Sequence, residues 1–358
     1  MAKQAHVKEI DRLREDFTES LRQGKVAESS NDLANKTLKY AQKVVGHGKY
    51  SNFRQLVTLL KVEKELIMKA VPTEFVVGNM FDRVVKLVRD EHMQAGKEEV
   101  AVDDHSVHLN KLWLKQDEEA LLTGKELKNG VMESMKEVFM ELDVTRENIA
   151  NQSADYVQQG DTLLTVAYSR TVLAFLKAAA KKCCFTVLVG DNAPVNDGRL
   201  LVSALKDAKL DVRVCSVRDA EFFARMSGVS KVILGAHAVL ADGAFIGNAG
   251  TFALTLAAKR YSVPVIVLAP FYKLTPKFLS VSDQESFNRH RSPREVIPFS
   301  EGGLVAETEV INVSFDFVPP ENVHLIITNT SANAPSYIYK ILAENYHPED
   351  TKLIASDQ

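Results

Sequence analysis

The sequence is short of cysteine and has no long apolar run, and each shortage excludes a class of protein. Its three cysteines, Cys183, Cys184 and Cys215, form neither a disulfide framework nor a C-x-x-C metal or redox pair. No segment reaches the roughly 18 consecutive apolar residues of a membrane span, and the N-terminus carries charges where a signal peptide needs an apolar stretch. We therefore expect a cytosolic protein that has no membrane partner.

An excess of positive charge is also missing. The 358 residues include 44 Lys and Arg against 47 Asp and Glu, so the formal net charge is −3. Proteins that bind the phosphate backbone of nucleic acids usually carry a basic footprint. We therefore expect no direct binding of nucleic acid.

Four well-known fingerprints are absent as well. The sequence contains no G-x-G-x-x-G, no G-x-x-x-x-G-K-[ST], no G-x-S-x-G and no H-E-x-x-H. Their absence argues against a nicotinamide enzyme, a P-loop NTPase, a serine hydrolase of the α/β type and a zinc peptidase. No cofactor and no metal is expected.

Residues 1–155 are predicted to form an all-helical domain. Apolar side chains recur there at steps of three and four residues, which is typical of amphipathic helices. The clearest stripe consists of Leu127, Val131, Met135, Val138 and Leu142. A further helix is predicted from about Thr145. Such stripes usually form a core, and a groove that binds a partner is the alternative.

A charged insertion near residues 96–119 interrupts these helices. Its charges are dense and its apolar residues keep no sustained period. We predict a loop here, with Trp113 as a candidate docking point.

Residues 156–358 are predicted to form a Rossmann-like α/β domain. Short runs rich in Val, Ile and Leu alternate with amphipathic segments, which indicates a doubly wound parallel sheet with helices on its faces. The predicted strands are 163–167, 185–189, 212–215, 232–234, 265–268 and 325–328. The predicted helices are 171–182, 198–209, 220–226, 251–260 and 336–346. A ligand is expected at the carboxyl ends of the strands.

Two helix starts in this domain are candidate anion sites. Ser169, Arg170 and Thr171 open the first helix, and Gly250 and Thr251 open a later one. The amides of a helix N-terminus suit a phosphate. For the first start, the alternative is that Ser169 only caps the helix while Arg170 pairs with a nearby carboxylate.

His237 follows the predicted strand 232–234 and begins a Gly-rich crossing. A histidine at a strand end is able to serve as a general acid or base. The alternative is a structural histidine held by hydrogen bonds.

Several of these motifs resemble a known superfamily. They are the Gly-Ala-x-x-x-Leu-Ala-x-Gly crossing at 235–243, Gly250-Thr251, Ala269-Pro270 and the Phe-Asp-x-x-Pro element that begins at Phe315. They are similar to motifs of the superfamily that joins the regulatory subunits of eukaryotic initiation factor 2B to the sugar-phosphate aldose-ketose isomerases. The matches at 77–80 (VGNM), 169–177 (SRTVLAFLK), 333–339 (NAPSYIY) and 346–348 (YHP) narrow the resemblance to the beta type of regulatory subunit.

The resemblance implies that two active-site positions have lost their original chemistry. In the isomerases, a Cys after the first strand and an Asp after the fourth strand work as an acid/base pair. The matching positions here are Ala167 and His237. Because Ala has no proton to give, and because loss of one such group typically removes a factor of ~10² to 10⁴ in rate, no useful isomerase activity is expected.

The resemblance also implies a set of partners. A regulatory subunit of this kind pairs with the homologous delta and alpha subunits and with the catalytic gamma and epsilon subunits. The complex supports exchange of GDP for GTP on initiation factor 2 and is inhibited when the alpha subunit of that factor is phosphorylated. The alternative is a sugar-phosphate isomerase, or a protein of the same fold that senses sugar phosphates or nucleotides.

Overall fold

The computed structural model describes residues 2–23, 29–98, 124–208, 211–347 and 350. Their contacts form two compact units, one made of Met1–Asp143 with Asn345–Gln358 and one made of Val144–Glu344. The expected domain boundary near residue 155 falls in α7 (Ser153–Tyr156). Most of the predicted insertion, with Trp113, lies outside the described residues. None of the described helices is long and apolar enough to span a membrane.

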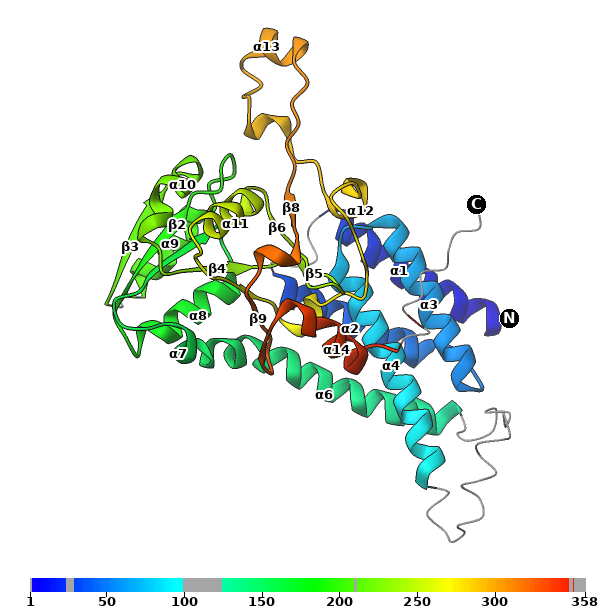
Figure 1. The fold of residues 1–358 in the computed structure, drawn as a ribbon. Coiled ribbons are helices and arrows are strands. Elements are labelled where there is room, and N and C mark those ends of the chain that lie inside the picture. Colours follow the sequence, from blue (N-terminus) through cyan, green and yellow to red (C-terminus); the bar gives the residue numbers. More distant parts are fainter. Residues whose placement is uncertain (1, 24–28, 99–123, 209–210, 348–349, 351–358) are drawn as a thin grey trace. The chain divides into compact units, whose positions relative to one another are not determined.

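The first unit is helical, as the sequence predicts (Figure 1). Its helices are α1 (Ala2–Arg22), α2 (Ser30–His47), α3 (Phe53–Ala70), α4 (Phe75–Glu98) and the first part of α6 (Gly124–Asn151). Side-chain caps fix two of the starts, because Ser29 accepts a hydrogen bond from the Asp32 amide and Asn52 accepts one from the Gln55 amide. The predicted apolar stripe 127–142 of α6 is buried.

The prediction that a separate helix begins at about Thr145 is wrong. Helix α6 runs without a break from Gly124 to Asn151. The segment 141–146 contains neither Gly nor Pro, so nothing in it ends the helix.

The second unit is an α/β domain, which confirms the predicted fold class. Its main sheet has seven strands in the order β10-β9-β7-β4-β1-β2-β3, and every neighbouring pair is parallel except β9 and β10. The strands are β1 (Thr162–Val166), β2 (Phe185–Gly190), β3 (Val212–Val217), β4 (Lys231–Gly235), β7 (Val265–Leu268), β9 (Leu325–Ile327) and β10 (Ala332–Asn333).

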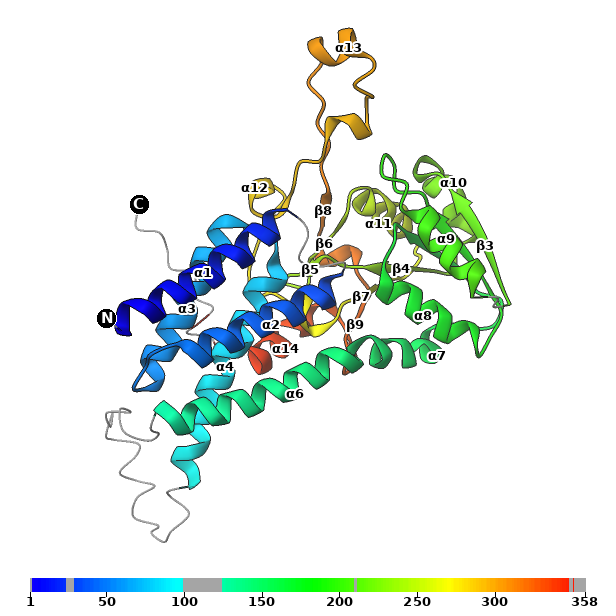
Figure 2. The ribbon, with the colours of Figure 1, turned by 180° about the vertical axis from the view of Figure 1, so that it is seen from behind.

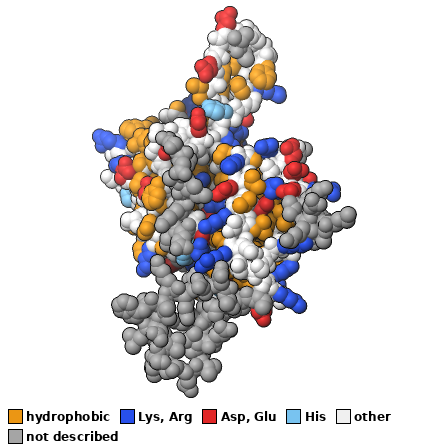
Figure 3. Space-filling view, turned by 90° about the vertical axis from the view of Figure 1, so that its right-hand side faces the viewer, with side chains coloured by type: hydrophobic (Ala, Val, Ile, Leu, Met, Phe, Trp, Pro, Cys, Tyr) orange, Lys and Arg blue, Asp and Glu red, His pale blue; other side chains and the backbone are white. Residues whose placement is uncertain are grey.

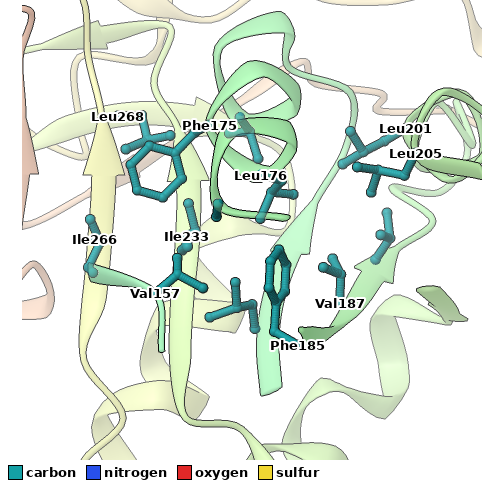
Figure 4. Packing of buried hydrophobic residues seen from close by; sticks show 14 of the residues in the cluster. Val157, Phe175, Leu176, Phe185, Val187, Leu201, Leu205, Ile233, Ile266 and Leu268 are labelled. Atoms are coloured by element: carbon teal, nitrogen blue, oxygen red, sulfur yellow. The ribbon is translucent and has the colours of Figure 1, made fainter. Parts of the chain in front are cut away.

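Helices cover this sheet and close its core. They include α8 (Arg170–Ala180), α9 (Gly198–Asp207), α10 (Phe222–Arg225) and α11 (Thr251–Arg260), and a further helix, α14 (Ile338–Asn345), follows β10. Figure 4 shows Phe175 and Leu176 of α8 packed over Ile233 of β4 and Phe185 of β2. Each of these side chains is almost completely buried. The core therefore positions the carboxyl ends of β1, β2 and β4 beside one another.

The sequence predicted no strand in the Gly-rich crossing, and the structure shows two short strands there. Residues 238–248 contain β5 (Ala238–Val239) and β6 (Phe245–Asn248), which join β8 (Phe315–Val318) in an antiparallel sheet of three strands. The crossing forms strands because Ala238, Val239, Phe245 and Ile246 are fully buried and their backbone groups then need partners.

Residues 289–313 form an arm that projects from the second unit and carries α13 (Gly302–Glu307) near its tip (Figures 1 and 3). The two chains of the arm meet at its base, where the Arg291 amide donates to the Asn312 carbonyl over 2.7 Å. Large apolar side chains are exposed along it: Val296, Phe299, Leu304 and Ile311.

Candidate functional site

The first candidate anion site, at the start of α8, is arranged as a helix cap. The Ser169 hydroxyl accepts a hydrogen bond from the Val172 amide over 3.4 Å. Thr171 is buried, and Arg170 is half-buried. Ala167, just before this start, is buried and has a left-handed backbone with φ of +63°, a conformation that is uncommon for a residue with a side chain. The capping role of Ser169 is therefore observed, and anion binding here stays a prediction.

The second candidate anion site, at the start of α11, already holds a carboxylate of the chain itself. One oxygen of Asp316 accepts hydrogen bonds from the amides of Gly250 and Phe252, over 2.8 and 3.0 Å. Gly250 has φ of +91°, a conformation for which glycine is favoured. Asp316 thus takes the position that a bound anion would occupy at Gly250 and Thr251.

Burial raises the pKa of Asp316, and the two backbone amides oppose this rise in part. The sequence reasoning used Asp316 only as part of a family motif and did not foresee its role. A phosphate at this helix start would have to displace or share with the carboxylate, and anion binding at Gly250 and Thr251 stays a prediction.

A polar cavity of about 230 Å³ lies at the carboxyl ends of β2 and β4, the edge of the sheet where a ligand was expected. The arm contributes part of its wall. The described lining residues are Asn192, Ala193, Pro194, Val195, Asp197, His237, Asn248, Ala249, Arg289, Arg291, Asn312, Val313, Ser314 and Phe315. Two arginines, a histidine and three asparagines give this cavity donors suited to an anionic or polyhydroxylated ligand.

His237 is held at one wall of this cavity. Its backbone amide donates to the Ile246 carbonyl over 2.7 Å, and its ring stacks on Phe315 with centroids 4.1 Å apart. The Arg289 guanidinium lies 5.3 Å from the centre of the Phe315 ring, within the range of a cation–π contact. His237 therefore lines the cavity with its ring packed on Phe315, and both interpretations of its role stay predictions.

The arm base is fixed by charge and amide contacts. The Arg291 guanidinium donates to both oxygens of Glu295, over 2.8 and 3.1 Å. The Asn312 side chain donates to Glu295 and to the Ser292 carbonyl. The Arg291 contacts lower the pKa of Glu295, so this pair is ionised near neutral pH. Sequence reasoning missed these residues because it predicted no helix or strand between the strands 265–268 and 325–328.

The structure separates the predicted site residues into different places. His237 lines the cavity, whereas Ala167, Ser169, Arg170, Thr171, Gly250 and Thr251 are not among its described lining residues. Among the same described residues, the cavity contains one carboxylate, Asp197, which accepts a hydrogen bond from the Asn192 side chain over 2.9 Å. None of the three cysteines is among them. A Cys–Asp acid/base pair is thus not assembled by these lining residues.

Comparisons with known proteins agree with the resemblance seen in the sequence. The model of the initiation factor 2 subunit family matches residues 26–335. The chain belongs to the initiation factor 2 subunit family. Members similar to it include the translation initiation factor eIF2B subunit beta of Dictyostelium discoideum, which is 32% identical over 86% of this chain and 88% of the relative.

The chain is also similar to a solved structure of a translation factor and to an enzyme. The structure of the tetrameric eIF2B-beta2-delta2 complex from Chaetomium thermophilum matches with a TM-score of 0.71 and 25% identity, over 96% of this chain and 98% of the other. The ribose 1,5-bisphosphate isomerase of Pyrococcus furiosus is 28% identical over 62% of this chain and 67% of the enzyme. The chain is thus similar both to translation factors and to a sugar-phosphate enzyme.

Proposed function

We propose that this chain is a non-catalytic regulatory subunit of the complex that exchanges guanine nucleotide on initiation factor 2. Similarity to an eIF2B beta subunit along most of both chains carries the proposal. Position 167, which the resemblance matches to a catalytic cysteine of the isomerases, is a buried alanine. The working parts are then surfaces for protein contact, and the complex acts in the cytosol.

The proposed partners are the homologous delta and alpha subunits and the gamma and epsilon subunits. A tetramer of beta and delta chains is known for the Chaetomium relative. In this chain the arm 289–313 supports such pairing, because it exposes Phe299 and Ile311, which are 59% and 70% exposed. Apolar side chains on a projecting segment favour burial against another protein.

The arm is tested by co-expression of the full chain with the delta subunit of the same organism. The double variant Phe299→Ser/Ile311→Ser is compared with Leu200→Ser/Leu256→Ser, which removes two exposed leucines of α9 and α11. The native mass of the purified complex should shift to that of the separate chains for the arm variant only. Equal effects of the two variants, or no effect of either, would speak against pairing through the arm.

The regulatory role is tested in the assembled complex. Release of GDP from initiation factor 2 should be slower when this chain is left out, and the complex should distinguish the factor with a phosphorylated alpha subunit from the unmodified factor. A phosphoserine adds about −1.5 to −2 charges at neutral pH, which is enough to change which charged surface of the complex the factor binds. Equal GDP release by complexes with and without this chain would contradict the proposal.

A second candidate function comes from the polar cavity, which retains Arg289, Arg291 and His237. The chain would then bind or isomerise a sugar phosphate, or sense a nucleotide. Calorimetry with ribose 1,5-bisphosphate and purine nucleotides separates these cases. Binding without turnover favours a sensor, and turnover that is lost in His237→Ala but kept in a surface control, Arg213→Ala, favours an enzyme.

A further inference from the structure

The helical unit contains an open groove of about 440 Å³ between α1 and α2, which lie side by side and face the viewer in Figure 2. Its described lining residues are Leu13, Asp16, Phe17, Ser20, Lys36, Lys39, Tyr40 and Lys43. The groove lies within one unit and shares no residue with the polar cavity of the α/β domain.

The floor of the groove is apolar and firmly held. The rings of Phe17 and Tyr40 stack with centroids 4.9 Å apart and an angle of 7° between their planes. The Tyr40 hydroxyl donates to buried Glu63 over 2.7 Å, and Arg14 donates to the other oxygen of Glu63 over 2.9 Å. Burial and the Glu63 contact raise the pKa of Tyr40, so the hydroxyl remains a neutral donor at physiological pH. A partner side chain thus meets a surface that is already ordered.

The wall of the groove is basic. Lys36, Lys39 and Lys43 follow one another along α2 at steps of three and four residues, which places them on one face of the helix. All three are exposed, although Lys36 also pairs with Asp32 over 3.2 Å. Three lysines stand against one carboxylate, Asp16, in a chain whose formal net charge is −3. The lining of the groove is therefore positively charged, whereas the chain as a whole is negatively charged.

We propose that this groove docks an acidic segment of a partner protein, which places one apolar side chain on the Phe17–Tyr40 floor and its carboxylates against Lys39 and Lys43. Charge complementarity identifies the occupant, because an apolar floor beside a row of cations matches an acidic amphipathic peptide. Amphipathic helices bind in this manner, with their apolar face in a hydrophobic groove. A nucleic acid would gain little from the concave apolar floor, because its binding depends chiefly on phosphate contacts. The proposal rests on the groove alone and stands or falls independently of the proposed exchange function.

The test uses the full chain purified with the proteins that it assembles with. A photo-crosslinking amino acid replaces Ser20, which lines the groove from α1. The crosslinked peptide is identified by mass spectrometry, and we expect an acidic segment of another protein that contains an apolar residue. The yield should fall as ionic strength rises, because exposed charges are screened.

Charge reversal supplies the matched comparison. In Lys39→Glu/Lys43→Glu the crosslink yield should drop roughly tenfold, and in Lys39→Arg/Lys43→Arg it should be kept. The control Lys125→Glu/Lys136→Glu makes the same change of net charge on α6 of the same unit and should leave the yield unchanged. Thermal unfolding of each variant verifies that it is folded.

Several results would overturn the proposal. One is a crosslink to a basic or uncharged segment, to nucleic acid or to this chain itself. Another is the absence of any crosslink. A third is a yield that falls equally in the α6 control. A loss of yield in the arginine variant would also count against it, since the proposed contact depends on positive charge.

Discussion

Asp316 in the α/β unit and Asp350 in the helical unit are both partly buried aspartates, yet their surroundings shift their pKa values in opposite directions. Asp316 accepts hydrogen bonds from two backbone amides, and burial raises its pKa because these amides only partly offset the loss of water. Asp350 meets Arg89 through two bonds of 2.7 Å and Lys61 over 2.8 Å. Burial alone would raise the pKa of Asp350, but these cations lower it.

The difference shows what each carboxylate does. Asp316 accepts the amides at the start of α11 and ties β8 to that helix. Asp350 belongs to the segment Asn345–Gln358, which is grouped with the helical unit, and its cations come from α3 and α4. An aspartate held by helix amides alone marks a place that a ligand could take over, whereas an aspartate held by two cations fastens one chain segment to another.

The largest effect should come from Asp350→Ala. Only 2% of this side chain is exposed, whereas Arg89 and Lys61 are 19% and 36% exposed, so the variant removes a buried carboxylate from two partly exposed cations. Breaking such a pair costs on the order of 2 kcal/mol, measured as the free energy of unfolding in denaturant. Asp90→Ala is the control, because Asp90 makes a partly exposed i,i+4 pair with Lys86 over the longer distance of 3.7 Å, a kind of pair that is worth about 0.5 kcal/mol. Similar losses of unfolding free energy in both variants would show that Asp350 does not hold its chain segment to α3 and α4.

The next effect should come from Asp316→Ala. The amides of Gly250 and Phe252 would lose their acceptor, which costs about 1–2 kcal/mol. Unfolding free energies of the variant and of wild type measure this, with Asp242→Ala as a control because Asp242 is exposed and accepts the Ala244 amide in a turn. No loss in Asp316→Ala, or an equal loss in the control, would mean that the carboxylate does not hold the start of α11.

A third effect tests whether the start of α11 is a replaced anion site. In Asp316→Ala the helix amides are vacated, so inorganic phosphate should stabilise this variant by about 1 kcal/mol at several times its dissociation constant. Wild type and Asp350→Ala should show no such gain. If phosphate raises the melting temperature of all three proteins equally, the prediction of an anion site at Gly250 and Thr251 loses its support.

The sequence was sufficient for the parts of this fold that depend on local pattern. The alternation of buried runs and amphipathic segments predicted six of the seven strands of the main sheet and missed the antiparallel edge strand β10. The Ser169 cap was one of two stated alternatives. The three-stranded sheet was not foreseen because β6 pairs with β8, which lies far along the chain, and short strands give no period of their own. Asp316 reaches its site through this pairing, and the arm residues Arg289 and Arg291 are placed by separate backbone hydrogen bonds with Ser314 and Asn312.

The smallest effect is a dependence on pH that should have opposite signs at the two carboxylates. The pKa of Asp350 is lowered in the folded protein, so the stability that it contributes is present above its unfolded pKa of 3.8 and is lost as pH falls through the folded value. The pKa of Asp316 is raised, so its contribution falls as pH rises from 3.8 through the folded value. Unfolding free energies of wild type, Asp350→Asn and Asp316→Asn across acidic pH give two difference curves. The wild-type advantage over Asp350→Asn should shrink on acidification and that over Asp316→Asn should grow, whereas curves of the same sign would remove the distinction between the two carboxylates.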